Sequence, residues 1–143
     1  MKPITETLRG MIERHEGFSA LPYRCTAGFL TVGFGHNLEQ LMNREEARAL
    51  MDVRLRATVR ELLLVLPELY SYGDVRAEAF IDMAFNIGLP SFRTFKRMIA
   101  AIIAKNWQVV ANEMEQSKWY RQVGNRGHEL VQMVRDGKRV PQL

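Results

Sequence analysis

Residues 16–36 read EGFSALPYRCTAGFLTVGFGH, and within them the apolar side chains change from a helical to an alternating period. Leu30, Val32 and Phe34 alternate with their neighbours, which predicts a strand with one buried face. Thr31 lies between them, so we expect its side chain to face the other way. The segment therefore predicts a β-structured part of the fold.

The residues before this strand complete a small sheet. Residues 21–24 predict an edge strand, because Pro22 has no N–H group to donate to a sheet ladder. Gly28, in the turn between the strands, can adopt a positive φ. A sheet of about two or three strands is too small to supply the main apolar core, so we expect that core to be helical.

Helical periodicity flanks the sheet on both sides. An apolar stripe that begins at Ile4 predicts a first helix running to about His15, with Pro3 at its first position and Gly17 closing it. Asn43, followed by a glutamate three residues later, predicts the capped start of a second helix that continues to Leu66. At about 1.5 Å per residue that helix is roughly 35 Å long, enough to connect two lobes.

The rest of the chain has helical periodicity throughout. We expect helices over residues 74–87, 91–103, 107–116 and 125–137, with Asp74 and Ser91 as capping residues, Ile103 facing inward and a turn at 117–120. The predicted fold class is α+β: a small N-terminal lobe with a β-hairpin or three-stranded sheet, a long connecting helix and a larger all-helical C-terminal lobe. Such a layout leaves a cleft between lobes, where ligands commonly bind.

The composition is that of a folded, water-soluble chain. Apolar residues make up 47% of the 143 residues and charged residues 25%, which excludes a disordered or fibrous protein. The longest uninterrupted apolar run, Met98–Ala104, is far shorter than the roughly 18 residues that span a bilayer, so we expect no membrane span. An early glutamate and the lack of an apolar stretch at the N-terminus predict no signal peptide.

Charge is unevenly distributed along the chain. Residues 1–92 carry 10 basic and 12 acidic side chains, whereas residues 93–143 carry 10 basic and 4 acidic ones. A basic half suggests an anionic polymer as partner: nucleic acid, a membrane surface or the bacterial wall. Trp119 and Tyr120 could stack on nucleic acid, but aromatic residues at a helix junction more often belong to the core, so we expect no nucleic-acid partner.

Two side chains near the predicted sheet are candidates for chemistry. Glu16 ends the first helix, where the helix dipole disfavours the ionised carboxylate, as suits a general acid; the alternative is an ordinary solvated glutamate. Cys25 stands beside Arg24, which favours the thiolate; the alternative is a small buried apolar residue. Because Cys25 is the only cysteine, an intramolecular disulfide is excluded and a cysteine-based zinc site is disfavoured.

Two other motifs fail on their spacing. A zinc-protease motif that begins at His15 needs a second histidine where Ser19 stands. A dinucleotide-binding motif that begins at Gly33 needs a third glycine where Leu38 stands, and no β-α-β unit surrounds it.

Glu16, Cys25 and Thr31 are separated by gaps of eight and five residues. This spacing and its flanking residues resemble the catalytic segment of the phage-type lysozymes (endolysin muramidases), in a cysteine-containing Glu/Cys/Thr variant. The resemblance extends over nearly the whole chain through three later segments: Asp82–Gly88, Ser117–Tyr120 and Asn125-Arg126. It implies a single lysozyme-like domain over residues 1–143, with an N-terminal lobe at about 13–60 and a helical lobe formed by 1–12 and 61–143.

The resemblance also implies an activity: hydrolysis of the β-1,4 bond between N-acetylmuramic acid and N-acetylglucosamine in peptidoglycan. Glu16 would protonate the leaving glycosidic oxygen, Cys25 would take the second catalytic role, and the Thr31 hydroxyl would hold the water. The reaction needs no metal or cofactor. Bacterial peptidoglycan would be the partner of a monomer that accumulates in the host bacterial cytoplasm and reaches the wall with the help of a holin.

Four further residues acquire roles from the same resemblance. Arg126 would reach back to Glu16 as an active-site support, and His36 would support the hairpin by hydrogen bonding. Phe85 and Asn86 would line the substrate cleft.

The cysteine departs from the aspartate that many family members carry at this position. As a base, a Cys25 thiolate would activate water and invert the anomeric centre, at about 6.5–9.5 Å from Glu16. As a nucleophile it would form a thioglycoside and retain configuration, at about 5–5.5 Å. Both mechanisms stay open, and the Thr31 spacing favours the base. Rival functions are a peptidase or amidase that uses Cys25 with His36 or His15, and a wall-binding module with little catalysis.

Overall fold

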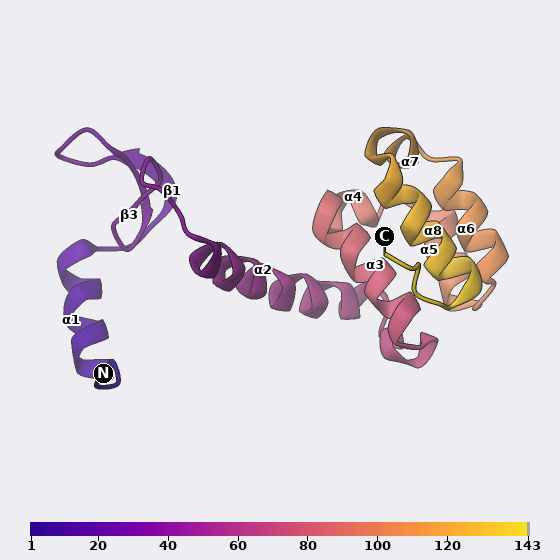
Figure 1. The fold of residues 1–143 in the computed structure, drawn as a ribbon, viewed down its shortest axis with the longest axis horizontal. Coiled ribbons are helices and arrows are strands. Elements are labelled where there is room, and N and C mark those ends of the chain that lie inside the picture. The colour runs from indigo at the N-terminus through magenta and orange to yellow at the C-terminus, as the bar shows by residue number, and fades with distance from the viewer. Residues whose placement is uncertain (143) are drawn as a thin grey trace. The chain divides into compact units, whose positions relative to one another are not determined.

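The computed structural model describes residues 1–142, and its internal contacts divide them into two units. The first unit is Met1–Ala47 and the second begins at Arg48. Most of the chain is helical, and the only sheet among the described residues is small, three-stranded and antiparallel (Figure 1). The predicted α+β fold class is confirmed. The predicted division into lobes at 13–60 and at 1–12 with 61–143 stays a prediction.

Helix α1 (Glu6–Glu16) opens the first unit. The Thr5 side chain accepts a hydrogen bond from the Leu8 N–H at 3.1 Å and so caps the helix. Pro3 therefore precedes the helix rather than starting it. Thr5, two residues after Pro3, is the first residue whose side chain can accept a capping hydrogen bond. Gly17 ends the helix with φ +70°, and its N–H donates to the Glu13 carbonyl at 2.8 Å.

The sheet has the strand order β1 (Ser19–Arg24), β2 (Leu30–Gly33) and β3 (His36–Asn37). Strand β1 is an edge strand, as Pro22 predicts, and its pairing with β2 is irregular between Ser19 and Tyr23. Thr31 in the central strand pairs with Tyr23 on one side and with Asn37 on the other.

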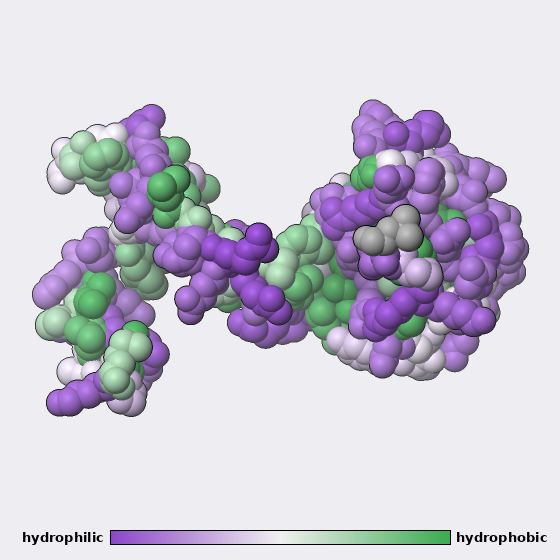
Figure 2. All heavy atoms as spheres, in the orientation of Figure 1, coloured by the Kyte–Doolittle hydropathy of each residue, from purple (hydrophilic) through white to green (hydrophobic). Residues whose placement is uncertain are grey.

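The buried face of β2 is opposite to the expected one. Thr31, 4% exposed, is the one buried residue among residues 1–47, whereas Leu30 and Val32 are half-buried and Phe34 is exposed. The alternation of apolar residues predicted the wrong face because the first unit has no apolar core of its own for β2 to face. Strands β1 and β3 flank Thr31 on both sides. Apolar side chains accordingly lie at the surface of this unit (Figure 2).

Helix α2 (Arg44–Val65) begins as its capping pair predicts. The Glu46 N–H donates to Asn43 Oδ1 at 2.8 Å, and Asn43 Nδ2 donates to Glu46 Oε1 at 3.1 Å. The helix contains the boundary between the two units, and its last turn reaches the core of the second unit through Leu62.

The second unit is built from helices around one apolar core. Its elements are the 3₁₀ helix η1 (Leu69–Tyr72) and the helices α3 (Asp74–Ile87), α4 (Leu89–Phe92), α5 (Lys96–Ile103), α6 (Trp107–Glu115), α7 (Lys118–Val123) and α8 (Asn125–Asp136). Helix α8 packs against both α3 and α6 (Figure 1). Phe80, Met83 and Phe92 are fully buried in this core.

Several capping predictions are corrected in this unit. Asp74 is the first residue of α3 and Gly73 is the cap; Ser91 lies inside the short helix α4. Ser117 accepts a hydrogen bond from the Tyr120 N–H at 3.1 Å, so residues 117–120 begin a helix instead of forming a turn. Ile103, expected inside, is 58% exposed because α5 ends there.

No helix within residues 1–142 is both long enough and apolar enough to cross a membrane.

Candidate active site

Glu16 lies at the end of α1, and its carboxyl group rests on the turn between β2 and β3. A β-carbon at Gly35 in that turn would overlap Glu16 Oε2 and lie 2.8 Å from Glu16 Cδ. Gly35 also has φ +77°, a conformation that L side chains rarely adopt. Glycine at position 35 thus allows the carboxyl group to approach the backbone of the hairpin.

Cys25 is the first residue of the loop that joins β1 to β2. Its N–H donates to the Phe29 carbonyl at 2.9 Å, and the Gly28 N–H donates to the Cys25 carbonyl at 2.8 Å. Hydrogen bonding by the backbone N–H of Phe29 is the largest influence on the thiol and lowers its pKa, aided by the backbone N–H groups of Ala27 and Gly28, while desolvation opposes the shift. The loop therefore favours the thiolate, and the thiol is half-exposed.

Thr31 is tied to the same loop. Its hydroxyl donates to the Phe29 carbonyl at 2.9 Å, which leaves the oxygen lone pairs of the hydroxyl as acceptors. The Phe29 carbonyl thus receives both the Cys25 N–H and the Thr31 hydroxyl. Glu16, Cys25 and Thr31 all belong to the first unit, but their catalytic roles stay predictions.

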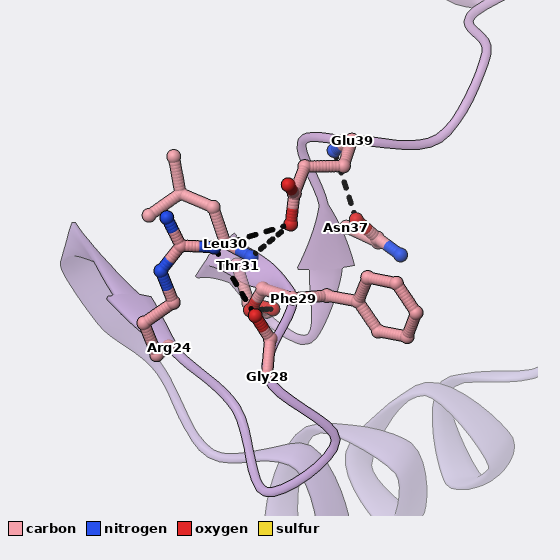
Figure 3. A network of polar contacts seen from close by, with 7 residues as sticks. All are labelled: Arg24, Gly28, Phe29, Leu30, Thr31, Asn37 and Glu39. Atoms are coloured by element: carbon pink, nitrogen blue, oxygen red, sulfur yellow. Dashed lines mark hydrogen bonds and ion pairs between the residues drawn. The ribbon is translucent and has the colours of Figure 1, made fainter.

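A polar network that the sequence did not reveal also holds the hairpin (Figure 3). Glu39 Oε2 accepts a hydrogen bond from the Leu30 N–H at 2.7 Å, and Arg24 donates to the Gly28 carbonyl at 3.1 Å. Arg24 and Glu39 also form an ion pair at 3.5 Å. The opposite charges of Arg24 and Glu39 were the only sign of this ion pair in the sequence. Without the strand register, the sequence does not show that the two residues lie close together.

His36 joins the hairpin through its β3 pairing with Val32 of β2. The residue is exposed. The role of the His36 side chain as an active-site support stays a prediction.

Arg126 lies in the first turn of α8, the last helix of the second unit, and is bound to α3. Its Nε donates to Asp82 Oδ1 at 2.7 Å and its terminal nitrogen to the Asp82 carbonyl at 3.4 Å. Both residues border a hollow of about 370 Å³ whose walls include Leu55 and Phe85. The role of Arg126 toward Glu16 stays a prediction.

Asn86 connects two of the motifs that the sequence singled out. Its Oδ1 accepts a hydrogen bond from Nε1 of the buried Trp119 at 2.9 Å, so α3 and α7 are joined by side chains 33 residues apart. The amide nitrogen of Asn86 has no such partner within residues 1–142 and is available to donate to a ligand.

The family model for phage lysozymes matches residues 13–136, which is most of the sequence. The chain belongs to the phage lysozyme family. The match includes the α1 end, the hairpin and all helices of the second unit, and it supports peptidoglycan hydrolysis by a glycoside hydrolase as the class of activity.

Named relatives are similar at modest identity. "Probable T4-type lysozyme 1" of Dictyostelium discoideum is 24% identical, over 94% of this chain and 96% of that protein. An endolysin of Acyrthosiphon pisum secondary endosymbiont phage 1 is 29% identical over 59% of each chain. The pre-baseplate central spike protein Gp5 of Enterobacteria phage T4 is 22% identical over 89% of this chain but only 27% of that protein.

Proposed function

We propose that this protein is a muramidase that hydrolyses the β-1,4 bond between N-acetylmuramic acid and N-acetylglucosamine in peptidoglycan. Glu16 is the general acid, Cys25 is the base that activates water, and Thr31 orients that water. Membership of the phage lysozyme family supports the substrate class. The single observation that carries the assignment of residues is the Cys25 loop, which favours a thiolate in the same unit as the Glu16 carboxyl group.

In this mechanism the protonated Glu16 carboxyl gives its proton to the glycosidic oxygen as the bond to the anomeric carbon breaks. The contact with Gly35 restricts where the carboxyl group can lie, because one side of the otherwise exposed Glu16 side chain meets backbone. A general acid must lie within hydrogen-bond reach of the atom it protonates, so this restriction favours the transfer.

The Cys25 thiolate takes a proton from water, and the resulting hydroxide attacks the anomeric carbon from the opposite face, which inverts its configuration. A free cysteine with a pKa of about 8.5 is only a few per cent thiolate at pH 7. The lowered pKa of Cys25 raises that fraction. Because the Thr31 hydroxyl proton is engaged with Phe29, the Thr31 oxygen is an acceptor for one hydrogen of the attacking water.

Residues of the second unit complete the proposal. Arg126 supports the active site, and Phe85 and Asn86 bind the glycan, with the free amide nitrogen of Asn86 as a donor to sugar oxygens. The excess of basic residues after residue 92 suits an anionic wall polymer.

The test is product analysis after digestion of purified peptidoglycan. A muramidase releases new reducing ends, which borohydride reduction converts to the alditol of N-acetylmuramic acid, without new amino groups. New amino groups would instead identify a peptidase or amidase. Sedimentation with the wall without either product would identify a binding module. Glu16→Gln is the matched variant, since it keeps the shape of the side chain and removes the transferable proton.

A further inference from the structure

The peptide group between Phe29 and Leu30 is bound on both of its edges. Its carbonyl oxygen accepts hydrogen bonds from the Cys25 N–H and the Thr31 hydroxyl, each at 2.9 Å. Its N–H group, on Leu30, donates to Glu39 Oε2 at 2.7 Å. Since a peptide group is planar, a contact that fixes one edge also orients the other. Glu39 thus lies opposite Cys25 and Thr31 across one rigid group.

Glu39 is itself held in place by the residues around it. Its own N–H donates to Asn37 Oδ1 at 2.8 Å, which fixes the backbone directly after β3 (Figure 3). Its carboxylate also meets the Arg24 guanidinium, which reaches on to the Gly28 carbonyl in the Cys25 loop. The side chains of this ion pair are 65% and 48% exposed, so its contribution is small. The short bond to Leu30 is the stronger connection.

We propose that Glu39 is a positioning residue for Cys25: it holds the Phe29–Leu30 peptide group, whose carbonyl oxygen accepts the Cys25 N–H, and so holds the loop in which Cys25 lies. This inference rests on the proposed function only for its bearing on catalysis. The contacts with Leu30, Phe29 and Thr31 belong to the first unit whatever reaction the chain performs.

The direction in which the pKa of the Cys25 thiol moves when Glu39 is replaced separates a positioning role from a simple effect of the Glu39 charge. The titratable side chains on the three strands and the loop after them are Tyr23, Arg24, His36 and Glu39, in addition to Cys25 itself. Removing a nearby negative charge by itself stabilises a thiolate and lowers the pKa of the thiol. Loosening the loop whose backbone N–H groups favour the thiolate destabilises that thiolate and raises the pKa of the thiol. The two explanations predict opposite directions.

The experiment compares Glu39→Met with Glu39→Gln in the full chain. Both substitutions remove the charge and nearly keep the length, but only glutamine keeps an oxygen that can accept the Leu30 N–H. The rate of alkylation of Cys25 by iodoacetamide is measured from about pH 5.5 to 9.5, since only the thiolate reacts. Glu45→Met, at an exposed position in the first turn of α2, is the control.

We expect Glu39→Met to react about threefold more slowly than the parent protein at pH 7, with its midpoint at higher pH. Glu39→Gln and Glu45→Met should stay within about twofold of the parent protein. Hydrogen exchange of the Leu30 amide should accelerate in Glu39→Met and not in Glu39→Gln. Circular dichroism establishes folding, and Glu39→Ala replaces Glu39→Met if the latter does not fold.

An unchanged or faster reaction of folded Glu39→Met would overturn the positioning role, as would an equal loss in Glu39→Gln. If the proposed function is wrong but the positioning role is right, the measurements give a different result. In that case the alkylation profiles shift as expected, while Cys25→Ser still digests peptidoglycan at the parental rate.

Discussion

The carboxyl group of Glu16 lies against Gly35, so closely that a β-carbon at residue 35 would approach Glu16 Cδ to 2.8 Å. The last residue of α1 and the turn between β2 and β3 thereby share one contact. Nineteen positions of sequence separate the two residues. The contact links the proposed general acid to the hairpin that carries Cys25 and Thr31.

Gly35→Ala should therefore impair catalysis more than an equally strained substitution nearby. Alanine at φ +77° costs about 1–2 kcal/mol of stability, and its methyl group displaces the Glu16 carboxyl. Gly33→Ala is the matched control, because Gly33 has φ +67° and open space around its added β-carbon. Turbidity loss of wall suspensions and thermal melting should show similar destabilisation in both variants but a loss of lysis, about tenfold or more, only in Gly35→Ala. Equal lysis by the two variants would separate Gly35 from the chemistry.

Glu16→Gln should nearly abolish wall lysis and leave the fold intact. Glutamine matches the shape of glutamate but carries no proton to donate to the leaving oxygen, and positioned proton transfer contributes about 10²–10⁴-fold to a rate. Glu13→Gln on the same exposed helix is the control. Release of reducing ends measures activity, and circular dichroism measures folding. Retention of most activity in Glu16→Gln would remove the general-acid assignment.

The parts of the fold that were predicted correctly depend on local signals. Asn43 and Glu46 are three residues apart and cap α2 as expected, and Gly17 ends α1. Helix α3 spans the predicted residues because its apolar period continues over several turns. Signals of this kind act within one turn of a helix and can be read without knowledge of the fold.

The parts that could not be predicted depend on contacts between distant residues. Thr31 is buried by strands on both sides, which its own alternation could not reveal. Glu39 meets Leu30 only after β2 and β3 have paired, and Arg126 meets Asp82 across 44 positions. The helices α4 and α7, with four and six residues, are too short to establish a helical period.

Asn86→Ala should destabilise the second unit. Its Oδ1 is the acceptor for Nε1 of Trp119, which is buried, so alanine leaves that N–H group without a partner at a cost of about 1–3 kcal/mol. Gln108→Ala, at an exposed position in the first turn of α6, is the control and should change stability by less than about 0.5 kcal/mol. Urea unfolding followed by tryptophan fluorescence measures both. An unchanged midpoint in Asn86→Ala would show that another acceptor replaces Asn86.

The pH dependence of lysis should follow the ionisation of Cys25. Backbone N–H groups, that of Phe29 above all, lower the pKa of this thiol in the folded chain, so the thiolate forms at lower pH than in an unfolded chain and is lost as the pH falls through the folded value. Alkylation by iodoacetamide should therefore have its midpoint at lower pH in the folded protein than in urea, and wall lysis should rise with pH through the same folded midpoint.

Cys25→Asp tests the same assignment with a different base. A carboxylate ionises near pH 3.9, so this variant should lyse walls at mildly acidic pH, where the thiol of the parent protein is protonated. Cys25→Ser has no group that ionises in this range and should be inactive throughout. If Cys25→Asp and the parent protein had the same pH profile, a group other than residue 25 would be the base, because the two side chains ionise several pH units apart.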